Sequence, residues 1–240
     1  MMKLERTIYQ KSHLYFVVFF LLMLAGFWLT YFTKLLDQEN YRMHLHGITM
    51  IVWCALLIAQ AYLIRVKKFT IHKQAGKLSY VVVPLIAFTT VDLYKYRLQE
   101  LESLTVRDYL FTASVLLALL TFLIFYGLAI VYKNKPAIHA RYMICTIIPM
   151  FTAVIDRIID SYLPSLARYF PDVEGPVVQV VGLTLGDMLL VALSVWDWRS
   201  HKRINVFPVA LAIHLIYHYG VLNFYRFEFW QTFSTWFFNL

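Results

Sequence analysis

The sequence predicts an all-α polytopic membrane protein built as a bundle of seven transmembrane helices. Of its 240 residues, 60% are hydrophobic and only 15% are charged, whereas soluble domains have about a quarter charged residues. A membrane span needs about 20 mostly apolar residues, and the chain has seven such runs joined by short connections. We expect the spans at 13–34, 44–66, 76–97, 108–133, 138–162, 176–198 and 204–225.

The first run is preceded by Lys3, Arg6 and Lys11, as in a signal peptide. Its apolar core, from Leu14 to Thr33, is longer than the roughly 7–15 residues of a signal peptide's apolar region, and no small-residue cleavage site follows. We therefore expect a retained first helix. Together the spans predict one membrane domain, residues 1–225, without a soluble module.

The net charge of +8 is distributed by side of the membrane. Assigning the loops alternately, one side collects most of the basic residues and almost no acidic ones, whereas the other side is mixed. By the positive-inside rule the N-terminus is cytoplasmic and the C-terminus lies outside. This asymmetry indicates membrane topology and not a nucleic-acid partner. The basic side holds Lys3, Arg6, Lys11, Arg65, Lys67, Lys68, Lys73, Lys77, Lys133, Lys135, Arg141, Arg199, Lys202 and Arg203.

The C-terminal tail, residues 226–240, is too short and too polar to span. Its aromatic residues predict an anchor in the outer membrane interface. Cys54 and Cys145 fall within predicted spans at different depths, so no disulfide framework is expected. The residues expected to form this anchor are Trp230, Phe233, Trp236 and Phe237.

Seven polar residues lie inside the spans at similar depth in the predicted outer half. Counted from the outer span ends at about 1.5 Å per residue, His46 lies roughly 5 Å deep, Asp92 and Arg157 roughly 7 Å, Asp156 and His218 roughly 9 Å, and Asp187 and His214 roughly 15 Å. Ionisable residues within spans usually face a bundle interior or a cavity and mark a functional site. We call these seven residues the outer polar layer.

The pair His214 and His218 lies on one helix face, because the two residues are four apart. Such a pair chelates one metal ion in HExxH helices. His46 or Asp92 would supply a further zinc ligand, and Asp156 would hydrogen-bond to a ligand residue. Haem instead takes one imidazole from each side of the ring. His46 opposite His218 or His214 meets that demand, whereas His44 points about 200° away from His46 on a helix.

Two further histidines, His72 and His139, open the third and fifth spans at the cytoplasmic side. They would hold a second haem or would lie at the interface beside Lys73, Arg141 and lipid phosphates. Asp156, Arg157 and Asp160 are also compatible with an internal ion-pair network. Basic residues near the outer layer, including Arg42, Lys95, Arg97 and Arg157, would neutralise haem propionates.

Two segments carry a resemblance to known families: HLHGITMIVWCALLIAQAYLIRVKKFTIHKQAGKLSY and KPAIHARYMICTIIPMFTAVIDRII. Both are similar to a family of uncharacterised bacterial multi-spanning membrane proteins. The placement of His46, His72 and His139 distantly resembles that in transmembrane cytochrome b proteins, which carry two haems and move electrons across a membrane. The HxxxH of the last span is similar to that of the seven-helix zinc hydrolases that include adiponectin receptors and alkaline ceramidases.

Three functions remain open on the sequence. The first is a haem b-binding electron-transfer protein with His46, His214, His218, His72 and His139 as candidate ligands. The second is a zinc-dependent hydrolase with His46, His214, His218 and Asp92 as candidate metal ligands. Under the haem and the zinc hypotheses alike, Asp156, Arg157 and Asp187 would contact and orient the ligand residues. The third is a non-catalytic subunit or a lipid- or solute-handling protein. Whether the protein is an enzyme stays open. We expect a bacterial cytoplasmic membrane location, contact with lipid, and a redox partner or a larger membrane complex.

Overall fold

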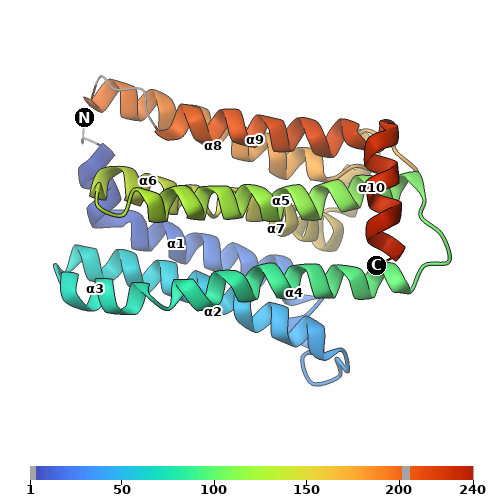
Figure 1. The fold of residues 1–240 in the computed structure, drawn as a ribbon, viewed down its shortest axis with the longest axis horizontal. Helices are drawn as coiled ribbons and strands as arrows, with labels where there is room; N and C mark the ends of the chain where they lie inside the picture. Colours follow the sequence, from blue (N-terminus) through green and yellow to red (C-terminus); the bar gives the residue numbers. More distant parts are fainter. Residues whose placement is uncertain (1–3, 202–205, 240) are drawn as a thin grey trace. The chain divides into compact units, whose positions relative to one another are not determined.

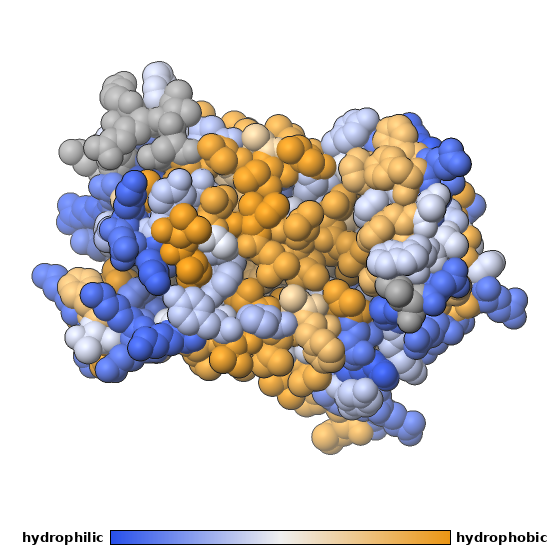
Figure 2. Space-filling model, in the orientation of Figure 1, coloured by the Kyte–Doolittle hydropathy of each residue, from blue (hydrophilic) through white to orange (hydrophobic). Residues whose placement is uncertain are grey.

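The computed structural model describes residues 4–201 and 206–239. Within them, seven helical segments are long and apolar enough to cross a membrane, which confirms the predicted class. In Figure 2 the hydrophobic side chains gather over the middle of the helices and the hydrophilic ones toward their ends. The segments are Leu4–Trp28, Tyr41–Arg65, Phe69–Gln99, Val106–Val131, Pro136–Tyr162, Gln179–Ser200 and Val206–Arg226.

The first helix, α1 (Leu4–Trp28), begins and ends earlier than the predicted span 13–34. Leu4, Ile8 and Ser12 are buried, so packing extends the helix through a stretch that hydropathy alone excludes. After α1 the chain turns, with a short 3-10 helix at Phe32–Lys34. The predicted seventh span starts at 204, outside the described residues, and α9 runs over Val206–Asn223.

Two of the seven segments are each made of two helices. The third consists of α3 (Phe69–Gly76) and α4 (Ser79–Gln99), and the fifth of α6 (Pro136–Cys145) and α7 (Ile148–Tyr162). Pro149 lies in the first turn of α7, where its missing N–H is tolerated, and the fifth segment breaks into two helices just before it. Pro208 lies in the first turn of α9, which is not broken there.

By their contacts the helices form two compact units. The first unit is Met1–Leu93 with Trp196–Arg203, and it contains α1, α2 (Tyr41–Arg65), α3 and most of α4. Here α2 packs against both α1 and α3. The buried side chains of α2 include Trp53 and Leu57. The backbone N–H of Leu4 donates to Ser200 Oγ at 3.2 Å, which ties the start of α1 to the end of α8.

The second unit is Tyr94–Val195 with Ile204–Leu240. Its central helix, α5 (Val106–Val131), packs against α6, α7 and α9. Most of α8 (Gln179–His201) also belongs to it. Gly182 of α8 lies directly against α7, because a Cβ built on it would come within 2.5 Å of Thr152 Cα. Gly182 and Gly186 are four residues apart on α8, and small residues at this spacing allow close helix packing.

The predicted C-terminal tail forms a helix, α10 (Glu228–Asn239), that crosses the end of α5 in Figure 1. Trp230 and Phe237 are buried, whereas Phe233 is 37% and Trp236 56% exposed. Trp230 Nε1 donates to the carbonyl oxygen of Tyr109 at 3.0 Å. Two of the four residues expected to form the anchor therefore pack onto the second unit, and the other two remain available for the interface.

Candidate functional site

Asp187 of α8 links the two histidines of α9. Its Oδ1 lies 2.7 Å from His214 Nδ1 and its Oδ2 lies 2.6 Å from His218 Nδ1. The four-residue spacing places both imidazoles on one face of α9, and one carboxylate spans them. The sequence predicted Asp187 as a support for the ligands, and the structure gives it contact with both histidines of α9.

The hydrogen bonds of Asp187 also assign the protons of the two rings. An ionised carboxylate only accepts hydrogen bonds, so each Nδ1 carries a hydrogen and each neutral ring keeps a lone pair on Nε2. His214 is fully buried, and its Nε2 has no hydrogen-bond partner among the described residues. A bare lone pair is the less costly state for that atom, because an unpaired buried N–H would lose its hydration entirely.

The two Nε2 atoms differ in access. The ring of His214 lies against Gly186, where an added Cβ would come within 2.9 Å of Nε2 and 3.1 Å of a methyl carbon of Ile148. The side chain of His218 is 18% exposed. The outer of the two histidines can therefore present its Nε2 to a ligand, and the inner one is enclosed by α7 and α8.

Two predicted site residues of the first unit, His46 and Asp92, lie on α2 and α4. His46 Nδ1 is 3.3 Å from Thr89 Oγ1, and the hydroxyl of Thr89 donates to the carbonyl oxygen of Ile86. One turn away, Arg42 Nε lies 3.1 Å from Asp92 Oδ2. Asp92, a candidate zinc ligand, is thus paired with an arginine, and Arg42 has a carboxylate partner.

His44 is bound through both ring nitrogens, unlike His46. Its Nδ1 lies 3.0 Å from the hydroxyl of Tyr31 and its Nε2 lies 2.8 Å from the carbonyl oxygen of Gln38. Tyr31 is buried, and this burial raises the pKa of its hydroxyl. The Tyr31 ring also fills the space beside Gly47, where an added Cβ would come within 3.1 Å of the ring. That space is therefore closed to a neighbouring helix or a flat ligand.

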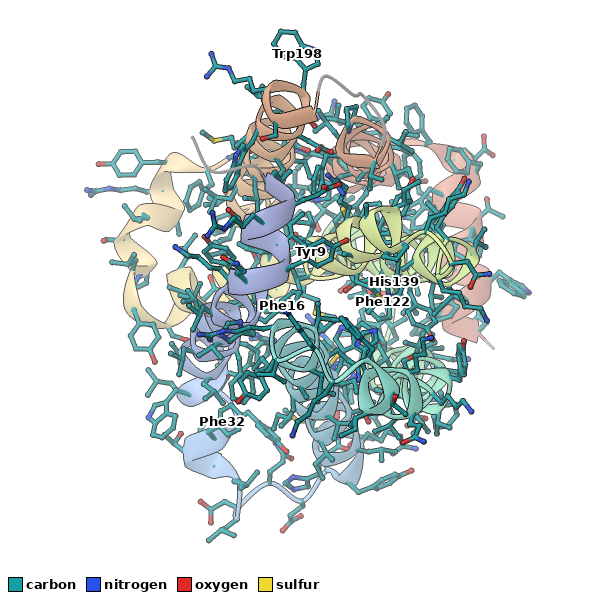
Figure 3. The ribbon with its side chains drawn as sticks, turned by 90° about the vertical axis from the view of Figure 1, so that its left-hand side faces the viewer. Tyr9, Phe16, Phe32, Phe122, His139 and Trp198 are labelled. Atoms are coloured by element: carbon teal, nitrogen blue, oxygen red, sulfur yellow. The ribbon has the colours of Figure 1, made fainter. Side chains whose placement is uncertain are left out.

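Each of the two histidines at the predicted cytoplasmic side is held by its Nδ1. His139 of α6, labelled in Figure 3 with Phe122 of α5, has Nδ1 2.8 Å from the carbonyl oxygen of Ala129. The amide nitrogen of Gln60, in the orientation that satisfies its neighbours, donates to His72 Nδ1 at 2.6 Å. His139 belongs to the second unit, whereas His72 belongs to the first.

Among the described residues, the charged side chains of α7 form no close ion pair with one another. Within the described residues, neither Asp156 nor Asp160 forms a salt bridge with Arg157. One carboxyl oxygen of Asp156, Oδ1, is buried without a hydrogen-bond partner. One turn earlier, Thr152 accepts a hydrogen bond of 3.2 Å from the hydroxyl of Tyr217.

His13 is a buried polar residue that the sequence patterns did not single out. Its Nε2 accepts a hydrogen bond of 2.7 Å from Arg65, and its Nδ1 is buried without a partner among the described residues. The residue was missed because the predicted first span began at 13, which placed His13 at a polar helix end. A span boundary drawn from helix periodicity rather than hydropathy would have found it.

Within residues 4–201 and 206–239, no three histidine, cysteine, aspartate or glutamate side chains come together in a way that could hold a metal ion. The zinc set proposed from the sequence therefore gains no support from this geometry. Compared with protein-family models, with curated proteins and with solved structures, the chain shows no match.

Proposed function

We propose that the chain is a haem b-binding redox protein of the membrane in which histidine Nε2 atoms ligate the iron. The observation that carries this proposal is the pair of hydrogen bonds from His214 and His218 to Asp187. A histidine that ligates a metal almost always donates its other ring N–H to a carboxylate, a backbone carbonyl or water, which orients the ring and sets its tautomer.

The same arrangement recurs at two of the other candidate ligands, His139 and His46, but not at His72, whose Nδ1 accepts a hydrogen bond from Gln60. His139 directs Nδ1 to a backbone carbonyl and His46 directs Nδ1 to a threonine hydroxyl, and no hydrogen bond to their Nε2 is present in the described part of the chain. His44, which is not a candidate, has both ring nitrogens occupied. The contrast supports the candidate set, because an imidazole with both nitrogens engaged has no lone pair left for iron.

In the second unit we assign the ligand role to His218 and a positioning role to Asp187. The His214 ring is fully buried and lies against Gly186, whereas the side chain of His218 is partly exposed. A carboxylate on Nδ1 raises the basicity of the imidazole, and a more basic axial ligand stabilises the oxidised iron. Bound haem would supply the one-electron chemistry, while this chain orients its ligands.

The test is the visible spectrum of the purified protein. A Soret band that shifts on reduction with dithionite is expected, and His218→Ala should reduce or abolish it. His44→Ala is the matched control, because His44 is an imidazole of the same chain with no nitrogen free, and it should leave the band intact. A colourless protein with no bound haem would overturn the proposal, and stoichiometric zinc in that protein would favour the hydrolase.

We further propose that the protein lies in a bacterial cytoplasmic membrane with its N-terminus inside, as the distribution of basic residues favours. The electron would then reach or leave the haem through a redox partner or a larger membrane complex. Reporter fusions to the two termini test this orientation, since only a reporter on the C-terminus should be active outside the cytoplasm.

A further inference from the structure

A polar cluster of the second unit lies outside the histidine site. It consists of Asp156 and Thr152 on α7, Tyr217 on α9 and Ser114 on α5. The hydroxyl of Tyr217 donates to Thr152 Oγ1 at 3.2 Å, and the buried Ser114 side chain lies near the Tyr217 hydroxyl. Tyr217 is 1% exposed and Thr152 is 3% exposed. Three helices therefore contribute hydroxyl groups to one buried line.

Asp156 lies at the end of this line, and Arg157 attracts its carboxylate electrostatically but forms no salt bridge with it among the described residues. Thr152 and Asp156 are four residues apart on α7, so their side chains are neighbours on one helix face. Asp156 Oδ1 is buried without a hydrogen-bond partner, and no salt bridge reaches Asp156 within the described residues. Arg157 is exposed and, as the next residue on the helix, projects about 100° away.

Asp156 as a whole is partly exposed, but its Oδ1 is buried without a partner. An unpaired charge on a buried oxygen is costly, so a carboxyl group in that position binds a proton instead. The side chain next along the same face is Asp160, which is exposed. It lies one turn nearer the end of the span at Tyr162 and thus joins Asp156 to the polar end of the helix. The other titratable group facing Asp156 is Tyr217 from α9.

We infer that the Asp156 carboxyl is a reversible proton-binding site inside the second unit, which exchanges its proton with the aqueous side at Asp160. In the forward step the carboxylate takes one proton from hydronium and releases water, and the reverse step returns it. The hydroxyls of Thr152, Tyr217 and Ser114 stabilise the site from within the bundle. The site goes beyond the proposed haem function and does not require haem to be bound.

Infrared difference spectra of the full chain in lipid nanodiscs, recorded between alkaline and acidic buffer, test this inference. We expect a protonated-carboxyl C=O band that grows on acidification, shifts down in D₂O and is lost in Asp156→Asn. The exposed neighbour supplies the matched control, since Asp160→Asn should keep the band. A band that survives in Asp156→Asn, or the absence of any pH-dependent carboxyl band, would overturn the inference.

Two further variants keep the inference testable if the Asp156→Asn protein does not fold. Asp156→Glu retains the carboxyl and should move the frequency of the band, because the longer side chain places the group in a different environment. Thr152→Val removes the neighbouring hydroxyl at nearly constant volume and should also move it. An unchanged frequency in both variants would assign the band to another carboxyl and contradict the inference. Haem content plays no part in either readout, so the two proposals fail separately.

Discussion

Asp187 and His214 are joined by a 2.7 Å hydrogen bond between Oδ1 and Nδ1, and Gly186, next to Asp187, packs against the same imidazole. The bond and the packing come from adjacent residues of α8, so the position of the carboxylate depends on how closely α8 approaches α9. This coupling makes both residues sensitive to substitution, for different physical reasons.

Replacing Asp187 with asparagine should weaken both histidine contacts. The amide keeps one acceptor but presents its NH₂ to the other Nδ1–H, so a donor faces a donor. We expect a loss of about 1–3 kcal/mol in stability from the unsatisfied buried group. If haem is bound through His218, its reduction potential should rise as the carboxylate is lost. Thermal unfolding and a spectroscopic redox titration measure the two effects, and an unchanged potential would remove the positioning role of Asp187.

Gly186→Ala should destabilise the second unit through overpacking. The added Cβ would lie 2.8 Å from His214 Cε1, and crowding of this kind costs about 1–3 kcal/mol. Gly127→Ala in α5 is the control, because a Cβ there has no neighbour within 4 Å. That variant should be neutral or stabilising by about 0.5–1 kcal/mol, since alanine is the better helix former. Equal melting temperatures for the two variants would contradict the close approach at Gly186.

The Tyr31–His44 contact predicts a stability effect at alkaline pH. Burial raises the folded-state pKa of Tyr31 above the ordinary value of 10.0, so the folded protein holds the phenol proton more tightly than the unfolded chain. The contribution is complete below about pH 10 and is lost as the pH rises through the folded pKa. Tyr31→Phe should flatten this alkaline decline in melting temperature. A decline of unchanged slope would assign it to other groups.

Proton binding at Asp156 predicts a pH-dependent reduction potential if the chain also binds haem. One proton taken up with each electron gives a slope of about 59 mV per pH unit, the value for a tenfold change in a one-electron equilibrium. Asp156→Asn should lower that slope toward zero, and Asp160→Asn should leave most of it. A pH-independent potential in the unaltered protein would show that the two processes are not coupled.

Much of the fold follows from the sequence because hydropathy reports directly on burial in lipid. Seven spans were predicted from apolar run length alone, and the structure has seven corresponding segments. The error at α1 has a physical cause, because polar residues such as Ser12 and His13 are buried against other helices and hydropathy does not record that packing. The length of an apolar run also does not record the break between α6 and α7.

The sequence by itself determined which residues have the chemistry for a site: His46, His214, His218 and the acidic residues of α7 and α8. Spacing along one helix also determined that His214 and His218 share a face. Only the tertiary structure decided that Asp187 bridges those two histidines, that Asp92 pairs with Arg42, and that Asp156 keeps an oxygen without a partner. Partner choice between helices depends on their rotation and separation, which here rest on close contacts at residues such as Gly182 and Gly186. Periodicity along one helix carries no information about the rotation of another.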